Sequence, residues 1–159
     1  MPETTALPTE TLNSAKDEKY LIFSIFGRQY AFPSDIIGEV ANCTPLYTLP
    51  LLPSYVLGVI NRYSIPYALL DTGFLLAETP GPRNEALVIK NDIDHVAFSI
   101  DTVSGIASIG PDKLNRLETG SGPRELTSDV YASFNWNGND VFVLDVRRVL
   151  ARITEEEVR

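Results

Sequence analysis

The sequence predicts an all-β protein that folds as two small, similar β-barrels of five strands each, with short helical turns. Short apolar segments rich in β-branched and aromatic residues alternate with turn residues over 19–152. The first half of this region also resembles the second half. A chain of 159 residues with an apolar fraction of 44% is large enough to bury a core without disulfide bonds or metal ions.

Three hairpins are predicted from pairs of such segments separated by turn residues. They join residues 20–26 with 29–32, 86–89 with 96–100, and 131–134 with 141–144. The last hairpin is the best defined, because both residues of Asn137-Gly138 accept the positive φ of a two-residue turn. Segments containing proline and glycine predict irregular connectors at 45–53, 78–84 and 119–124.

An internal repeat sets the expected number of barrels. A shift of 66 residues places Ala31-Phe32 on Ala97-Phe98, and a shift of 74 residues places Leu70-Asp71 on Leu144-Asp145. The segments therefore follow the order A–B–A′–B′, with about 60 residues in each A–B unit, which is too few for comfortable stability alone. We expect two packed β units, with Asp71 and Asp145 capping the short helical turns that follow them.

The chain divides into three parts. Residues 1–18 are rich in Thr, Pro, Glu and Ser, lack an apolar period, and are expected to form a flexible N-terminal tail. Residues 19–152 hold the two interlocked β-barrel subdomains. Residues 153–159 are expected to form an acidic, solvated C-terminal end.

Composition argues against several kinds of partner. The net charge is −8 and no basic stripe is visible, so neither nucleic acid nor direct contact with an anionic membrane is expected. The first residues lack the pattern of a signal peptide, and no apolar run approaches the ~18 residues that span a bilayer. A single cysteine, Cys43, allows no intrachain disulfide bond. We therefore expect a cytoplasmic protein.

No catalytic, cofactor-binding or metal-binding residues are predicted. Cys43 and His95 are the only cysteine and histidine, which argues against a Cys/His metal cluster, and no glycine-rich phosphate loop follows a clear strand. A Cys43–His95 nucleophile and base is the enzymatic alternative, whereas a buried thiol and a strand-edge imidazole is the structural interpretation we prefer. A non-enzymatic protein is expected, and a barrel that binds a small ligand stays open as an alternative.

Four segments follow the pattern of one known family. They are Tyr20-Leu21-Ile22-Phe23 with Gly27 and Tyr30, Ile37-Gly38-Glu39-Val40, Tyr55-Val56-Leu57-Gly58-Val59-Ile60-Asn61 with Asp71, and residues 97–106. These segments resemble, in order, the opening hairpin, the V-x-E-I/V segment, the G-V-x-N-L-R-G…P-V-x-D-L region and the second-barrel strand pair of the CheW family. The resemblance covers nearly all of residues 19–152 and implies two SH3-like five-stranded barrels.

The resemblance to the CheW family also implies a function. It implies a non-enzymatic adaptor that binds the cytoplasmic hairpin tip of a chemoreceptor and the regulatory domain of a histidine kinase, without a cofactor. An auxiliary CheW-like paralogue in a non-flagellar chemosensory pathway is an alternative.

By position, the candidate receptor-side residues are Ile37, Glu39, Gly58, Asn61 and Tyr63. Each has a structural alternative. Ile37 then belongs to the core, Glu39 is a solvated strand residue, Gly58 serves close packing, and Asn61 satisfies a turn.

One segment departs from the family pattern. Arg62-Tyr63-Ser64 stands where the family has Leu-Arg-Gly, so Tyr63 takes the position of the arginine. Arg62 lies one place earlier, which in a strand is the opposite face. Ser64 replaces a glycine and disfavours a turn with positive φ. We therefore expect a more apolar receptor contact than in typical members of the family.

Overall fold

The computed structural model describes residues 17–117 and 129–158, with the side chains of all but residues 154–158. Its strands are β1 (Glu18–Ile25), β2 (Arg28–Pro33), β3 (Ile37–Asn42), β4 (Val56–Arg62), β5 (Ile65–Asp71), β6 (Glu85–Ile89), β7 (Val96–Ile100), β8 (Thr102–Ile109), β9 (Asn115–Arg116), β10 (Val130–Trp136) and β11 (Asn139–Leu144). The predicted hairpins are confirmed as β1–β2, β6–β7 and β10–β11. Most of the predicted tail and the predicted connector at 119–124 lie outside the described residues.

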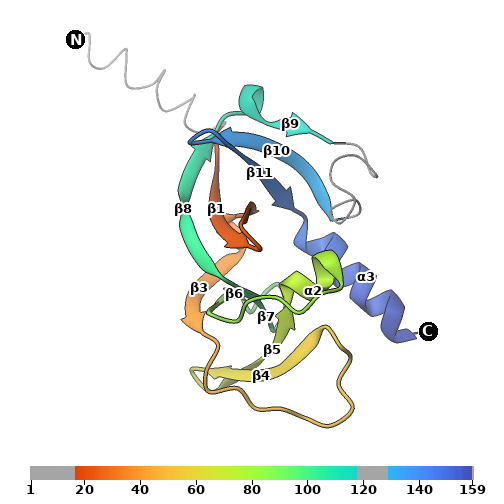
Figure 1. Cartoon of the computed structure of the whole chain (residues 1–159). Helices are drawn as coiled ribbons and strands as arrows, with labels where there is room; N and C mark the ends of the chain where they lie inside the picture. The colour runs from red at the N-terminus through yellow and green to blue at the C-terminus, as the bar shows by residue number, and fades with distance from the viewer. Residues whose placement is uncertain (1–16, 118–128, 159) are drawn as a thin grey trace.

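The strands form two mixed sheets, which lie one above the other in Figure 1. One sheet has the order β8-β1-β2-β11-β10-β9, and the other has the order β3-β6-β7-β5-β4. Neighbours pair antiparallel except for β2 with β11 and β5 with β7, which pair parallel. The expected all-β fold with two small β subdomains and few helices is confirmed.

The repeat extends to the register of the strands. Ile22 pairs with Ala31 across β1–β2, and the equivalent residues Val88 and Ala97 pair across β6–β7. The β4–β5 ladder shifts register after Val56, and the β10–β11 ladder shifts at the equivalent position. The order β8-β1-β2-β11-β10 therefore repeats as β3-β6-β7-β5-β4, and β9 is an addition.

The subdomains interlock because each repeat divides its strands between the two sheets. β3 follows β2 in the first repeat but pairs with β6 of the second. In the same way, β8 belongs to the second repeat and pairs with β1 of the first. The β4–β5 hairpin of the first repeat also joins the second repeat, through the pairing of β5 with β7, so the five-stranded sheet comes from the contiguous segment 37–100. The six-stranded sheet joins β1 and β2 to strands that follow this segment.

The largest apolar cluster connects the two sheets. Along β1, Tyr20 and Ile22 join the cluster of their own barrel, whereas Leu21 and Phe23 join a cluster that includes Leu87 from the other sheet. The rings of Phe32 and Phe98, which are repeat equivalents, lie 5.2 Å apart within this shared cluster. The space between the barrels is therefore packed with side chains along these strands.

Two helices follow the aspartates that were predicted to cap them. The Asp71 carboxylate accepts a hydrogen bond from the Phe74 amide at the start of α2 (Thr72–Ala77). Asp145 accepts from the amides of Arg147 and Arg148 at the start of α3 (Val146–Val158). These capping roles are confirmed.

Helix α3 is longer than the short turn expected there, and residues 153–158 continue it. Its apolar residues Val146, Val149 and Ile153 pack on the shared cluster, which gives the helix a reason to extend. Arg152 of α3 also donates hydrogen bonds to the Leu75 carbonyl and to the carboxylate of buried Asp129. In the described part of the chain, no helix is both long and apolar enough to span a membrane.

Candidate functional site

An ion pair joins β3 to the end of β4. Arg62 donates two hydrogen bonds to Glu39, with Nε–Oε1 and Nη2–Oε2 distances of 2.8 and 3.0 Å. These hydrogen bonds are the main reason that the pKa of Glu39 lies below its ordinary value. Alternation along a strand places the Arg62 side chain on the face opposite that of Tyr63, so the sequence did not predict the ion pair with Glu39. The long guanidinium side chain reaches Glu39 from the last position of β4.

The β4–β5 hairpin presents a tyrosine at its tip. Tyr63 and Ser64 form the two-residue turn with φ values of 54° and 66°. Serine at this position therefore does not prevent the positive-φ turn, in contrast to the expectation from the sequence. The Tyr63 side chain is 83% exposed, and its ring centre lies 5.3 Å from the Arg62 guanidinium carbon.

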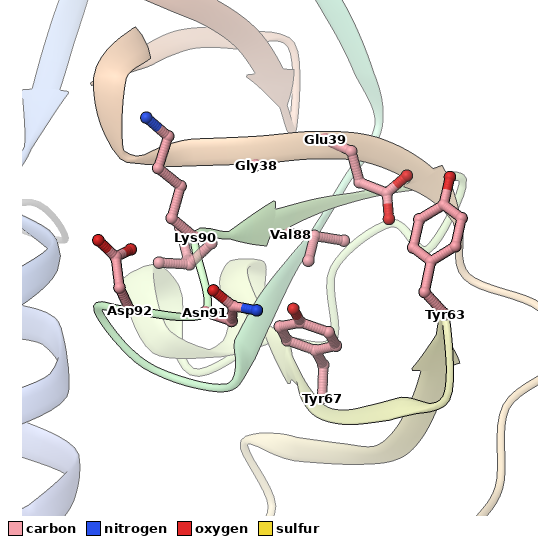
Figure 2. Close-up of a pocket in the computed structure, with 9 residues that line it drawn as sticks. Gly38, Glu39, Tyr63, Tyr67, Val88, Lys90, Asn91 and Asp92 are labelled. Carbon is pink, nitrogen blue, oxygen red and sulfur yellow. The ribbon is translucent and has the colours of Figure 1, made fainter.

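A pocket of about 610 Å³ opens beside this hairpin. It is lined by Gly38, Glu39, Tyr63, Tyr67, Val88, Ile89, Lys90, Asn91 and Asp92. Figure 2 shows the Tyr67 ring between Tyr63 and Asn91, with Val88 and Glu39 beyond it and Lys90 and Asp92 at the opposite side. Tyr67, Val88 and Ile89 are only 6%, 2% and 0% exposed, so the accessible surface of the pocket comes mainly from Tyr63 and from polar and charged residues.

The five residues predicted from the family pattern separate into two groups. Glu39 and Tyr63 lie together at the pocket. Asn61 is exposed on β4, where it pairs with Pro66 of β5. Ile37 is half-buried against the shared apolar cluster, and Gly58 is buried with φ of 154°. A Cβ atom at Gly58 would lie 2.5 Å from the Tyr47 carbonyl oxygen, so this position needs glycine for close packing.

Sequence analysis did not identify several residues of the pocket. Tyr67 is one apolar position in an apolar strand, and nothing in its spacing marks it as a wall of a pocket. Lys90, Asn91 and Asp92 fall at or in a segment that the sequence marks only as a turn. The position of Lys90–Asp92 beside Glu39 depends on the pairing of β3 with β6, which repeat similarity alone does not specify.

Among the described residues, no group of three or more His, Cys, Asp or Glu side chains is placed to hold a metal ion. Cys43 is buried in the apolar cluster of the second barrel, and burial raises the pKa of its thiol. His95 packs its ring edge-on against Tyr67. Both positions agree with the structural interpretation of these residues.

A sequence profile described as the CheW-like domain matches residues 19–154. The chain belongs to the CheW-like domain family. Among solved structures, the scaffolding protein TtCheW from Thermoanaerobacter tengcongensis is similar, with a TM-score of 0.71 and 13% sequence identity. The similarity covers 82% of this chain and 85% of that one, and at this identity it supports the CheW fold alone. No curated protein matches the chain.

Membership of the CheW-like family supports a scaffold adaptor of chemotaxis signalling at the level of the family. In the CheW-like fold of this chain, the pocket lies at the edge of the second barrel, between β3, the β4–β5 hairpin and the end of β6. The family motif points to two of its lining residues, Glu39 and Tyr63.

Proposed function

We propose that this protein couples chemoreceptors to a histidine kinase as a non-enzymatic adaptor in the cytoplasm. The observation that carries the proposal is the exposed Tyr63 ring beside the Glu39–Arg62 ion pair and the pocket. A helical receptor tip needs such a mixed surface, in which apolar area supplies affinity and polar groups at the rim set orientation. Nucleic acid and direct membrane contact are not part of the proposal.

The conformation of Tyr63 supports a role in binding. A bulky residue at positive φ is unfavourable, and such positions persist where another requirement outweighs the cost. The repeat equivalent of Tyr63-Ser64 is Asn137-Gly138, with φ values of 51° and 83°. The second repeat thus uses the residues that favour this turn, whereas the first repeat carries an aromatic ring that is turned to solvent.

The other predicted residues support this surface in different ways. Glu39 and Asn61 offer polar groups on β3 and β4, with Arg62 holding the Glu39 carboxylate in place. Ile37 and Gly58 are proposed to support this surface without touching the receptor. Ile37 packs on the core, and Gly58 lets β4 approach the chain at Tyr47. The receptor-side surface that we propose therefore consists of Glu39, Asn61 and Tyr63, with Arg62 added and with Ile37 and Gly58 as its support.

The kinase is proposed to bind elsewhere on the two barrels. Its regulatory domain is expected to be built from similar barrels, so that barrel ends pack on barrel ends. Separate surfaces would let one adaptor hold the receptor and the kinase together.

The test is a binding experiment with purified components. The protein is titrated with a receptor cytoplasmic hairpin fragment and, separately, with a kinase regulatory domain, by calorimetry. Saturable binding of each fragment, and a ternary complex on gel filtration when both are present, are the expected results. If neither fragment binds, or if each displaces the other, the coupling function is wrong.

A further inference from the structure

The two barrels have equivalent segments at one edge of their sheets. In the first barrel, β9 pairs with β10, and Asn115 lies opposite Ser133. The second barrel has no full strand at this place, but Tyr47 pairs with Val59 of β4 through two backbone hydrogen bonds of 2.8 and 2.9 Å. Because Val59 and Ser133 are repeat equivalents, the segment at Tyr47 takes the place of β9 at the edge beside β4.

The two edge segments differ in charge. The segment that contains β9 carries Asp112, Lys113 and Arg116, all of them exposed. Charged side chains on the edge of a sheet discourage pairing with another chain. Residues 40–61, which include the edge at Tyr47, contain no charged side chain. The edge of the second barrel therefore lacks the protection that charge gives to the first.

The uncharged edge also exposes apolar side chains. Tyr47, Leu49 and Leu51 are 57%, 55% and 102% exposed. Leu51 has a φ of 62°, which is unfavourable for leucine, so the fold alone explains neither its conformation nor its exposure. Figure 1 shows this connector between β3 and β4 at the end of the molecule away from the six-stranded sheet.

Backbone groups of this edge are available for pairing. Neighbouring residues of an extended segment direct their backbone groups to opposite sides, so Leu46 and Thr48 direct theirs away from β4. No backbone hydrogen bond joins either residue to the part of the chain that the structure describes. Pro45 and Pro50, which have no N–H group, stand at the two ends of the segment. The open edge is therefore short.

We propose that this edge pairs with the same edge of a second copy of this chain. Antiparallel pairing of two identical edges is self-complementary and closes as a dimer. Charge favours this occupant, because copies with a net charge of −8 repel each other and an uncharged surface is where that repulsion is weakest. A partner selected by opposite charge would meet charged residues, and residues 40–61 offer none.

The size of the contact predicts a weak dimer. The three exposed apolar side chains offer roughly 300–400 Å² on each copy, about half of the ~800 Å² that a stable interface buries on each partner. A short ladder of backbone hydrogen bonds adds to this contact. A dissociation constant on the order of 0.1 mM is therefore expected. No larger assembly should form, because the dimer occupies the edge of both copies.

Analytical ultracentrifugation of the full-length protein tests the proposal. The average mass should rise reversibly from monomer toward dimer between about 10 µM and about 1 mM. Added NaCl should strengthen the dimer, because it screens the repulsion between two acidic copies. A dimer that weakens in NaCl would depend on opposite charges and would contradict the proposed contact.

Two arginine substitutions provide a matched comparison. Thr48→Arg gives this edge the residue that stands at the equivalent place in β9, which is Arg116. It should weaken the dimer at least about tenfold, because two arginines would lie close together in the short ladder. Ser108→Arg adds the same charge at an exposed position of β8 and should leave the dimer unchanged. Both variants should melt at the wild-type temperature, since both positions are exposed.

A third variant separates association from folding. Glycine suits the positive φ of Leu51, so Leu51→Gly should leave the melting temperature unchanged or raise it. Loss of the exposed side chain should nevertheless weaken the dimer several-fold. A dimer of unchanged strength in this variant would contradict the role of the apolar side chains.

A protein that stays monomeric up to about 1 mM would overturn the proposal. Weaker binding of the kinase or receptor fragment by Thr48→Arg would then assign the edge to that partner. A dimer that Thr48→Arg does not weaken would place the contact elsewhere and would also overturn the proposal. The adaptor function stands or fails separately, because its test uses receptor and kinase fragments and this one uses neither.

Discussion

Tyr63 and Asn137 occupy the same position in equivalent hairpin turns, with φ values of 54° and 51°. Asparagine accepts this conformation readily and tyrosine does not. The two turns can therefore be compared within one chain. One has residues that favour the turn conformation, and the other has an exposed aromatic ring in its place.

Giving the β4–β5 turn the residues of the β10–β11 turn should stabilise the protein. Tyr63→Asn combined with Ser64→Gly should raise the free energy of unfolding by about 1–2 kcal/mol, because two unfavourable positive-φ residues are removed. Urea denaturation measures the change. The reverse pair, Asn137→Tyr with Gly138→Ser, should destabilise by a similar amount. A loss of stability in the first pair would mean that contacts of Tyr63 with Arg62 outweigh the backbone cost.

Removing the Tyr63 ring should weaken receptor binding. Tyr63→Ala is expected to cost about 1–2 kcal/mol of binding free energy if the ring is an interface anchor, with the melting temperature unchanged or slightly raised. Calorimetry with the receptor hairpin fragment measures the affinity, and Asn137→Ala is the matched control on the other barrel. Unchanged receptor affinity would show that Tyr63 is not an anchor. Affinity for the kinase regulatory domain should be the same in all three proteins.

The Glu39–Arg62 pair should make part of the stability depend on pH. The folded-state pKa of Glu39 is depressed, so its contribution is present above the unfolded-state pKa and is lost as pH falls through the folded-state pKa. Glu39→Gln should therefore be less stable than wild type near neutral pH, and the difference should shrink in acid. Urea midpoints measured across this range test the sign.

The same comparison in an Arg62→Gln background is the control for the ion pair. There, the pH dependence of the Glu39→Gln difference should largely disappear, because the hydrogen bonds that lower the pKa are gone. High salt should reduce the effect in the wild-type background, since both side chains are partly exposed. A difference that grows in acid would contradict the assignment.

Gly58 should be sensitive to substitution because of close packing. Gly58→Ala is expected to destabilise by about 2–4 kcal/mol, since its Cβ would meet the Tyr47 carbonyl oxygen at 2.5 Å and its φ of 154° disfavours a side chain. Gly27→Ala is the comparison, because that turn has positive φ but no atom within 4 Å. Gly27→Ala should cost only about 1 kcal/mol. Equal losses in urea denaturation would rule out the packing explanation.

The sequence allowed the repeat, the hairpins and the capping aspartates to be predicted because each depends on local patterns. Matching segments such as Leu70-Asp71 and Leu144-Asp145 identify equivalent elements. They do not identify the sheet to which an element belongs, so the exchange of β3–β5 with β8, β10 and β11 was seen only in the structure. Alternation along a strand gives the direction of a Cβ atom, but it does not give the reach of a long side chain such as Arg62.

The candidate site was predicted in part for the same reasons. Glu39 and Tyr63 follow from the family pattern, whereas Tyr67 and Lys90 come from separate segments that meet through the pairing of β5 and β6 with β7. Ile37 and Gly58 match the same pattern, yet their contacts are those of the core. A motif thus marks positions without separating those that touch a partner from those that support the surface.

Because the repeats exchange strands, the segment that repeats along the chain is not the segment that forms one sheet. One A–B segment alone would hold five strands, but its own β3 pairs with no strand of the same segment. Two copies of such a segment could complete both sheets only by trading β3, β4 and β5 across a twofold axis. The present chain is therefore equivalent to a strand-swapped dimer made covalent, and cutting it between the repeats should yield halves that fold only together. In a single chain the two halves need not be identical, and one turn has Asn137-Gly138 where its counterpart has Tyr63-Ser64.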